Sequence, residues 1–326
     1  MSSQAIYRIY GLRVCSDLSM PAVSALDRGK IDLVVHQRGG IPPPDLPPSQ
    51  AIAIEWRESL QHWMLRYHTR ENHVLEFRLN KQATCIEIYC TCPQAKDDIA
   101  AVVLGPALGT ALYLRGLPVL HAAAVVVDGR AVLLAGTAGA GKSTLTAALV
   151  AKGVPLLAED LAVLTFGENA IIVQAGYPRL RLYPDATVII GRGAQNLPRV
   201  FPARAWVPDD KRWLDANDLA GGFRATPAPL EAVYLLAQRR SDRQALTIES
   251  LPPHRAGLAL LDHLYGARWL RIPTTKALEW CAGIAGSTRV RLVQAPPGLD
   301  RVGESADAII ADARRLAAAA EPIERH

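Results

Sequence analysis

The sequence predicts a mixed α/β protein in which a smaller β-rich domain precedes a larger domain built around a phosphate-binding loop. Three observations support this class. Apolar and polar side chains alternate in several stretches before residue 91, as in β-strands. An apolar hairpin then leads directly into a glycine-rich loop and a helix. Strand-like and helix-like segments follow to the C-terminal end. Because 326 residues are many for one core, we expect two domains, residues 1–115 and 116–326.

The first domain reads as an antiparallel meander of strands with one face in the core and one face in water. The proline-rich residues 42–48 indicate an extended surface linker. We interpret this domain as a scaffold or docking domain without chemistry of its own. The alternation places its strands at residues 7–14, 63–68, 75–79 and 86–90.

An apolar helix is expected to close the first domain, from residue 97 to about residue 116. Its apolar part, residues 99–114, contains Gly105, Pro106 and Gly109. It is shorter than the roughly 20 residues that cross a bilayer, and an internal proline kinks a helix. We therefore expect a buried, kinked helix and no membrane partner.

The second domain begins with a predicted β-hairpin. Residues 120–127 and 130–135 are apolar and rich in β-formers, and Asp128-Gly129 joins them, which is a strong hairpin signal. A helix over residues 144–152 is expected to end at Gly153. An antiparallel strand that feeds the loop predicts a mixed sheet and not an all-parallel one. Further periodicity predicts strands at residues 154–158, 161–166, 170–174, 230–237, 245–248 and 289–293, and helices at residues 255–265, 276–285 and 304–320.

Residues 136–143 read Gly-Thr-Ala-Gly-Ala-Gly-Lys-Ser and match the phosphate-loop pattern Gly-x₄-Gly-Lys-Ser at every fixed position. Glycines let backbone N–H groups surround a polyphosphate, and the next helix directs its positive end toward it. In this pattern Lys142 binds the β- and γ-phosphates and the Ser143 hydroxyl binds Mg²⁺. The motif predicts ATP and Mg²⁺ as cofactors. The nucleotide-binding residues expected are Gly136, Thr137, Ala138, Gly139, Ala140, Gly141, Lys142, Ser143 and Thr144.

Two further positions bear on catalysis. Glu159-Asp160 follows a short predicted strand, so that one carboxylate can hold Mg²⁺ while the other accepts a proton from an attacking hydroxyl. The alternative is a solvated turn. If Asp128-Gly129 is a two-residue turn, His121 lies opposite Gly136, beside the phosphates. A packed core histidine and a histidine that contacts phosphate both remain open.

Positive charge gathers in one part of the chain. The net charge is +5; residues 179–224 hold 8 basic and 5 acidic side chains, whereas residues 1–115 hold 12 and 11. A local excess suits an anionic ligand or an acidic peptide, and no nucleic-acid motif accompanies it. Arg179 and Arg181 share one face of an extended segment, and Lys211-Arg212 follows. These four can bind phosphate or an acidic substrate, or they are solvated loop charges.

Cysteine usage suggests a reducing compartment. The five cysteines are an odd number and no signal peptide is recognised, so we expect a cytoplasmic protein. Cys90-x-Cys92 allows a metal site, but no second pair has zinc-site spacing. We prefer two ordinary cysteines at the end of a strand.

Together, His121, the hairpin, Gly-x₄-Gly-Lys-Ser and the acidic pair resemble the HPr kinase-related serine kinases. The opening Tyr-Arg-Ile-Tyr-Gly-Leu of residues 7–12 is similar to the smaller relatives found in gene clusters for lasso peptides and other modified peptides. This resemblance implies a phosphoenolpyruvate-carboxykinase-like phosphate-loop fold, like the C-terminal domain of HPr kinase. It also implies a phosphotransferase that acts on a serine hydroxyl of a precursor peptide.

By the same resemblance, Asp160 is the catalytic base, Glu159 lies beside magnesium, and His121 neighbours the transferred phosphate. The family commonly has two aspartates where this chain has Glu159-Asp160. The glycine-rich signature of the reverse, phosphate-removing reaction is not found, which argues against HPr as the substrate. HPr kinases are hexamers, so a homo-oligomer is open. A small-molecule kinase and a nucleotide-binding regulatory module without turnover are the alternative functions.

Overall fold

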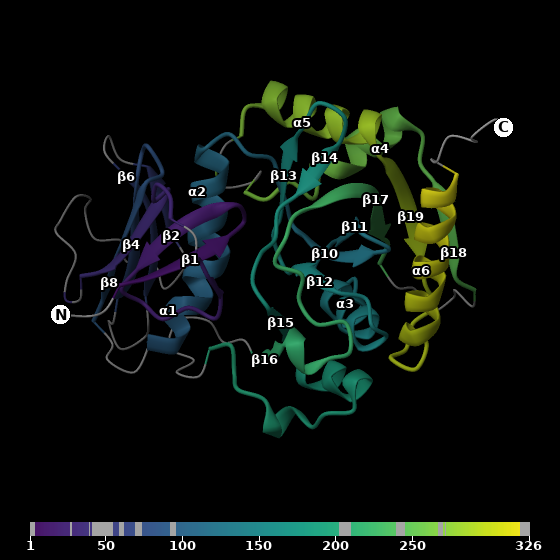
Figure 1. Ribbon diagram of the computed structural model, residues 1–326, viewed down its shortest axis with the longest axis horizontal. Coiled ribbons are helices and arrows are strands. Elements are labelled where there is room, and N and C mark those ends of the chain that lie inside the picture. Colours follow the sequence, from purple (N-terminus) through teal and green to yellow (C-terminus); the bar gives the residue numbers. More distant parts are fainter. Residues whose placement is uncertain are drawn as a thin grey trace.

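The computed structural model describes residues 4–26, 28–38, 40, 55–58, 62–68, 74–91, 96–201, 210–238, 245–266, 270 and 272–319. Within these residues it is a mixed α/β protein with two large sheets and a small two-stranded one. The first large sheet lies on one side of the molecule and the second on the other, with a helix between them (Figure 1). The predicted linker at residues 42–48 lies outside the described residues.

The first sheet is mixed and not a simple antiparallel meander. Strands β5 to β8 are antiparallel neighbours, as predicted, but β4 pairs in parallel with both β2 and β8. The spatial order is β3-β1-β2-β4-β8-β7-β6-β5. The strands are β1 (Ala5–Ile9), β2 (Leu12–Ser16), β3 (Val23–Ser24), β4 (Leu33–Gln37), β5 (Glu55–Glu58), β6 (His62–His68), β7 (Val74–Asn80) and β8 (Cys85–Cys90).

Two expectations for this sheet were wrong. Residues 7–14 are not one strand, because Tyr10 (φ +52°) and Gly11 (φ +80°) form a left-handed turn between β1 and β2. Nor is one face of β7 wet, since Glu76 is fully buried and Arg78 is 3% exposed. The Glu76 carboxylate accepts hydrogen bonds from the guanidinium groups of Arg66 and Arg78. Burial of these charges is tolerated because they are paired.

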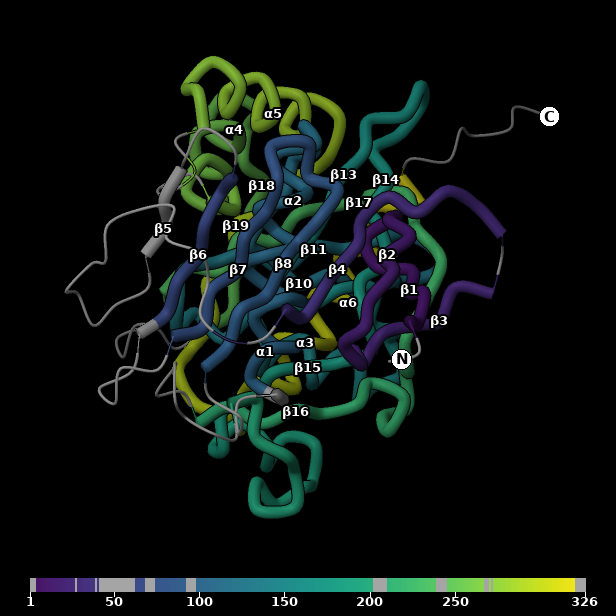
Figure 2. The backbone as a smooth tube through the Cα atoms, turned by 90° about the vertical axis from the view of Figure 1, so that its left-hand side faces the viewer, coloured from purple at the N-terminus to yellow at the C-terminus, as the bar shows by residue number. Residues whose placement is uncertain are grey.

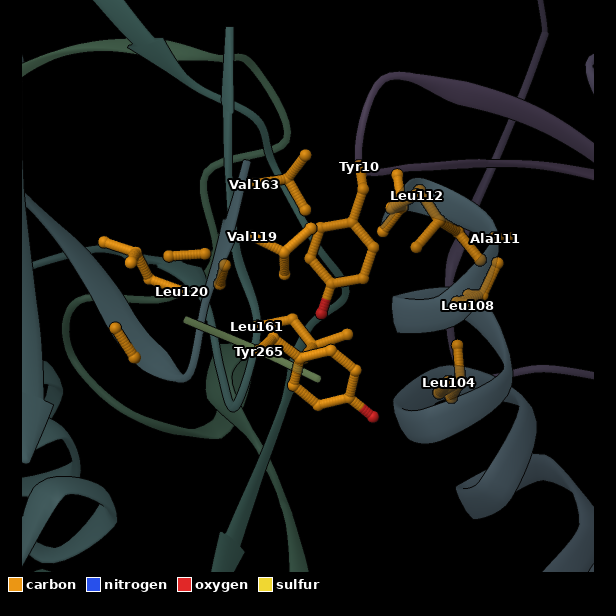
Figure 3. Packing of buried hydrophobic residues seen from close by; sticks show 14 of the residues in the cluster. Tyr10, Leu104, Leu108, Ala111, Leu112, Val119, Leu120, Leu161, Val163 and Tyr265 are labelled. Atoms are coloured by element: carbon orange, nitrogen blue, oxygen red, sulfur yellow. The ribbon is translucent and has the colours of Figure 1, made fainter. Parts of the chain in front are cut away.

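A continuous helical segment connects the two sheets and confirms the kinked helix that the sequence predicts. It consists of α1 (Lys96–Val102), a π-helical turn η2 (Val103–Ala107) that contains Pro106, and α2 (Leu108–Leu114). Gly116 (φ +78°) follows its end. The segment lies behind the first sheet in Figure 2. Its apolar side chains belong to one core cluster that includes residues of both sheets, as the close view in Figure 3 shows.

The second sheet confirms the predicted hairpin and the mixed strand directions. Val127 pairs with Arg130 and Ala122 with Ala135, across a turn at Asp128 (φ +45°) and Gly129 (φ +86°). Strand β11 also pairs in parallel with β17, and β17 with β19. The strands are β9 (Val119–Leu120), β10 (Ala122–Val127), β11 (Arg130–Gly136), β12 (Leu156–Ala158), β13 (Ala162–Phe166), β14 (Ile171–Val173), β17 (Ala228–Leu236), β18 (Thr247–Ser250) and β19 (Arg289–Gln294).

Both faces of the hairpin are buried. Val125 and Val132 pack into a cluster with α3 (Lys142–Ala151) and α6 (Val302–Ala318). Alternate residues such as Ala124 and Leu133 face the other cluster, to which α4 (Pro253–Leu261) and α5 (Thr274–Ser287) contribute. A strand buried on both faces reads as a continuous apolar run, as residues 122–127 do.

The described parts of the next segment, residues 176–201 and 210–229, contain regular secondary structure. They include β15 (Arg179–Leu182) and β16 (Arg212–Asp215), which form a two-stranded antiparallel sheet. Three 3₁₀ turns belong to the same region: η3 (Pro184–Ile190), η4 (Ala194–Asn196) and η5 (Ala216–Asp218). Leu180, Leu182 and Leu214 are buried in the α3 cluster. Among the described residues, no helix has the length and apolarity to cross a bilayer.

Candidate functional site

The glycine loop of residues 136–143 connects β11 directly to α3. Gly139 (φ +82°) and Gly141 (φ +92°) are in the left-handed region, where side chains are strained. A Cβ atom on Gly136 would lie 2.9 Å from the carbonyl oxygen of Leu236 on β17. Strand packing therefore requires glycine at the start of the loop, and backbone conformation favours it at the other two positions. The helix begins at Lys142, with Gly141 as its N-cap.

Lys142 folds back over the loop that precedes it. Its Nζ donates hydrogen bonds to the carbonyl oxygens of Gly136 at 2.7 Å and Thr137 at 3.3 Å. Burial lowers the pKa of Lys142, and the carboxylates of Asp160 and Glu159 oppose that effect. The ammonium group is thus held at the loop, near two acidic side chains.

Glu159 follows β12, and its side chain contacts the first turn of α3. The Ser143 hydroxyl donates a hydrogen bond of 2.9 Å to its Oε1. Its Oε2 is buried and has no hydrogen-bond partner among the described residues. Burial, followed by the charge of Asp160, raises the pKa of Glu159 to about 7, against the effects of Arg181 and the Ser143 hydrogen bond.

The unpartnered Oε2 beside the Ser143 hydroxyl fits a magnesium ion. Mg²⁺ prefers oxygen ligands and is commonly held by one or two carboxylates together with substrate phosphates. A serine and a carboxylate that meet at the end of a glycine loop are therefore a suitable donor set. In the described part of the chain, no group of three or more His, Cys, Asp or Glu side chains is placed to hold a metal by itself, at this site or at another. Cys92 lies outside that part.

Asp160 occupies a strained backbone position. Its φ is +69°, and the Leu161 N–H donates a hydrogen bond of 2.8 Å to the Glu159 carbonyl across it. This is a γ-turn of the rare positive-φ kind, and such a conformation costs about 1–3 kcal/mol. Strained residues of this type concentrate at functional sites. The turn points the two adjacent carboxylates into one space.

Two basic side chains, Arg181 and His121, flank the Asp160 carboxylate. His121 Nδ1 lies 3.3 Å from Oδ1, and Arg181 Nη1 lies 3.6 Å from Oδ2. Burial alone raises the pKa of Asp160, but Arg181, His121, Lys211 and Lys142 together outweigh it and lower the pKa. Asp160 is therefore ionised at neutral pH.

His121 lies at the junction of β9 and β10, just before the first hairpin pair. Ala122 pairs with Ala135, which is the register that the sequence predicted and that sets His121 opposite Gly136. The backbone N–H of His121 donates a hydrogen bond of 2.7 Å to the His263 carbonyl oxygen. Burial lowers the pKa of His121, Asp160 opposes this effect, and Lys142 and Lys211 add to it. The imidazole is accordingly neutral at neutral pH.

Arg181 is held from three directions. Its Nη2 donates to the Tyr177 hydroxyl oxygen at 3.0 Å and to the Ala101 carbonyl at 3.2 Å. Its guanidinium lies 5.0 Å from the centre of the Trp213 ring. A Cβ atom on Gly105 would come within 3.6 Å of this guanidinium. The connecting helix therefore packs against the Arg181 side chain.

Tyr10, in the turn between β1 and β2, contacts the backbone of the acidic pair. The Tyr10 N–H donates to the Ala175 carbonyl at 2.7 Å, and its hydroxyl makes a long hydrogen bond of 3.4 Å to the Glu159 carbonyl. Tyr10 and Tyr177 pack edge to face, with ring centres 6.3 Å apart. Figure 3 shows the rings of Tyr10 and Tyr265 between the connecting helix and the strands of the second sheet.

The glycine loop, the acidic pair, His121 and Arg181 line one cavity of about 340 Å³. Of the four basic residues singled out in the sequence, Arg181 and Lys211 line it, and Lys211 Nζ lies 4.9 Å from the Tyr183 ring centre. Arg179 and Arg212 lie outside it and pair with Asp215 and Asp210. The cavity is lined by His121, Ala123, Ala138, Gly139, Gly141, Lys142, Ser143, Thr144, Glu159, Asp160, Arg181, Tyr183, Asp185, Lys211 and Leu299.

Sequence reasoning missed the neighbours that come from other parts of the chain. Tyr10 could have been found from the neighbouring Gly11, because an isolated glycine inside a strand pattern suggests a bulge or a close backbone approach. Tyr177, Ala101 and Gly105 carry no local signal, because only the packing of the connecting helix against β15 brings them to the site.

Comparison with known proteins adds little to this geometry. No family model and no curated protein matches the chain. Among solved structures, the chain is similar to the HPr(Ser) kinase/phosphatase from Coxiella burnetii. The two are 15% identical, the match covers 60% of this chain and 96% of that one, and the TM-score is 0.35. A likeness at this level does not decide the activity.

Proposed function

We propose that this chain is an ATP- and Mg²⁺-dependent kinase that transfers the γ-phosphate to a serine hydroxyl of a peptide or protein. One observation carries the proposal: the glycine loop, the Ser143–Glu159 pair and the strained Asp160 carboxylate converge on the same cavity. A phosphate cradle alone would serve any nucleotide-binding protein. An ionised carboxylate beside it supplies what transfer to a hydroxyl also requires.

The nucleotide half of the site binds and orients ATP. Backbone N–H groups of the loop and the N-terminal end of α3 face the phosphates, and Lys142 supplies a positive charge to the β- and γ-phosphates. Ser143 and Glu159 would hold Mg²⁺, which neutralises charge on the phosphate oxygens. The pKa of Asp160 is lowered, so its carboxylate is ionised and can accept a proton from an attacking hydroxyl. The pKa of Glu159 is raised to about 7, and a bound Mg²⁺ would favour its ionised form.

Asp160 acts as the base in the transfer step. As the serine oxygen attacks the γ-phosphorus, its proton passes to Asp160, and the bond from the γ-phosphorus to the bridging oxygen breaks to release ADP. Arg181 keeps Asp160 ionised, and Arg181 and His121 together orient its carboxylate before the reaction. Arg181 and Lys211 also add positive charge around the transferred group, where negative charge spreads over three oxygens.

The acceptor class rests on the resemblance to HPr kinase-related serine kinases. It favours a precursor peptide of the lasso type and a phosphoenolpyruvate-carboxykinase-like arrangement of the second domain. The missing glycine-rich signature, a departure from the family, argues against the reverse, phosphate-removing reaction. A cytoplasmic location follows from the requirement for ATP, and a homo-oligomer is consistent with the same family. A small-molecule acceptor would use the same phosphate cradle.

The test is phosphotransfer followed by mass spectrometry. Peptides encoded by neighbouring genes, and HPr, are incubated with the protein, ATP and Mg²⁺. We expect one phosphate on a peptide serine. Asp160→Asn should bind ATP normally but turn over about 10²–10⁴-fold more slowly, as the loss of a base does. Asp185→Asn, which removes another carboxylate from the same cavity, is the matched control and should stay within a few-fold of wild type.

Each outcome has a distinct meaning. Normal turnover by Asp160→Asn would remove Asp160 from the mechanism. Transfer to small hydroxyl compounds but to no peptide would favour the small-molecule kinase. ATP binding with no transfer to any acceptor would favour a regulatory module and refute the kinase.

A further inference from the structure

A second cavity, of about 620 Å³, lies next to the site between the first sheet, the connecting helix and the β15–β16 ribbon. Its walls combine an aromatic ring and aliphatic side chains with three arginines: Arg179, Arg199 and Arg212. We call it the arginine groove. It is lined by Ser19, Met20, Pro21, Ala100, Arg179, Leu197, Pro198, Arg199, Arg212 and Trp213.

The arginine groove carries uncompensated positive charge. Arg179 pairs with Asp215 at 3.0 Å, while Arg199 and Arg212 share Asp210. Among the described residues, therefore, three guanidinium groups face two carboxylates, and neither carboxylate lines the groove. The Arg212 Nε is buried with no hydrogen-bond partner in this part of the chain. An anionic group is the ligand that such a surface accepts.

The groove lies next to the proposed active site along the β15–β16 ribbon, with the Arg181 guanidinium and the Trp213 ring between them. Arg181 pairs across the ribbon with Trp213, and Arg179 with Asp215. Residues directly opposite share a face, so Arg181, at the active cavity, and Arg179, at the groove, lie on the same side. Two residues along a strand span about 7 Å. If an extended acceptor peptide runs along the ribbon from Asp160, a residue two or three positions from its serine would come level with Arg179.

We propose that the arginine groove binds an acidic residue of the acceptor peptide, two or three positions from the phosphorylated serine. The proposal rests on the peptide-kinase function proposed above and adds a rule for substrate choice. Arg179 and Arg199 supply the charge, and Trp213 separates them from Arg181, which stays with the phosphates. A hydrophobic partner would form no ion pair with these guanidinium groups, and a basic peptide would be repelled.

Binding and transfer are measured on one peptide set. Fluorescent nonapeptides carry a central serine in a glycine–alanine background, with a glutamate pair moved stepwise along the chain, and a matched set carries lysines. Binding is followed by fluorescence anisotropy at low ionic strength, with a non-hydrolysable ATP analogue and Mg²⁺. The variant is Arg179→Gln/Arg199→Gln. The matched control is Arg192→Gln, which removes a surface arginine paired with Asp218 and outside both cavities.

We expect the glutamate peptides to bind at least tenfold more tightly than the lysine peptides, with an optimum two or three residues from the serine. The double variant should lose about tenfold of that affinity, as expected when charge-assisted hydrogen bonds are lost. Arg192→Gln should bind the glutamate peptides as tightly as the wild type does. Equal binding of both peptide sets, or an acidic preference that survives the double variant, would overturn the proposal.

Phosphorylation of the same peptides separates this proposal from the kinase proposal. Transfer without an acidic preference would support the kinase proposal and refute the role of the groove in substrate choice. An acidic preference in binding that the double variant abolishes, without any transfer, would leave the groove as a peptide-binding surface and remove the kinase.

Discussion

Replacing Glu159 by glutamine should change how the stability of the ligand-free protein depends on pH. Glu159 is 3% exposed and its pKa is raised to about 7 by burial and by Asp160. Between pH 4.5 and 7 the folded protein therefore keeps a proton on Glu159 that the unfolded chain has lost. The unfolding free energy falls as pH rises through this window, because the folded state binds more protons.

The size of the effect follows from the same shift. A pKa raised from 4.5 to about 7 corresponds to about 3 kcal/mol of stability that is present at pH 4.5 and lost by pH 8. Glutamine carries no such charge. Its buried amide group needs a hydrogen-bond partner, and this changes the unfolding free energy by an amount that does not depend on pH. The comparison between pH 5 and pH 8 cancels that amount, and Asp160, whose pKa is lowered, stays ionised throughout.

The assay is thermal unfolding followed by circular dichroism at pH 5, 6, 7 and 8, without ligands. Relative to wild type, Glu159→Gln should gain about 5 °C in Tm between pH 5 and pH 8, at roughly 2 °C per kcal/mol. Glu168→Gln, on the exposed turn between β13 and β14, is the control. Parallel pH profiles for wild type and Glu159→Gln would refute the assignment of a buried carboxylate with a raised pKa.

The remaining predictions concern nucleotide binding and packing. Lys142→Ala should weaken binding of a fluorescent ATP analogue by about 10²-fold, since it removes the positive charge held at the loop. Lys152→Ala, which breaks an exposed pair with Asp307, should leave that affinity unchanged, and equal losses in both variants would contradict the role of Lys142. Gly109→Ala should lower stability by about 1–3 kcal/mol in thermal unfolding, because its Cβ would lie 2.3 Å from the buried Tyr265 ring. Gly303→Ala, with open space on α6, should be neutral or stabilising, and a Gly109→Ala protein as stable as wild type would show that the ring can move.

Local chemistry explains why the centre of the second domain could be predicted. An Asp-Gly pair between apolar runs favours a two-residue turn, and the pairing register follows from that turn. The glycine loop and the end of α3 at Gly153 depend on backbone conformations that few other residues adopt. Each of these features is encoded within a short segment, so the sequence alone indicated where the loop and the acidic pair would be.

Long-range packing decided what the same patterns could not. The alternation at residues 7–14 is the same whether they form one strand or a hairpin, and the buried Glu76 looks like a solvated residue until its two arginines are placed. Arg179, Arg181 and Arg212 were equivalent as basic residues of one segment. Their pairing with Asp215, Asp160 and Asp210 separated them into two cavities.

By itself, the sequence determined the hairpin, the glycine loop and the carboxylates at the end of a strand, because local backbone preferences and periodicity dictate them. Only the tertiary structure decided which distant groups surround those carboxylates. Tyr10 and Ala101 precede the hairpin of the second sheet in the chain, yet they contact Glu159 and Arg181. Such contacts form when two sheets bury a shared core against one helix, and that burial depends on the whole chain rather than on any short segment.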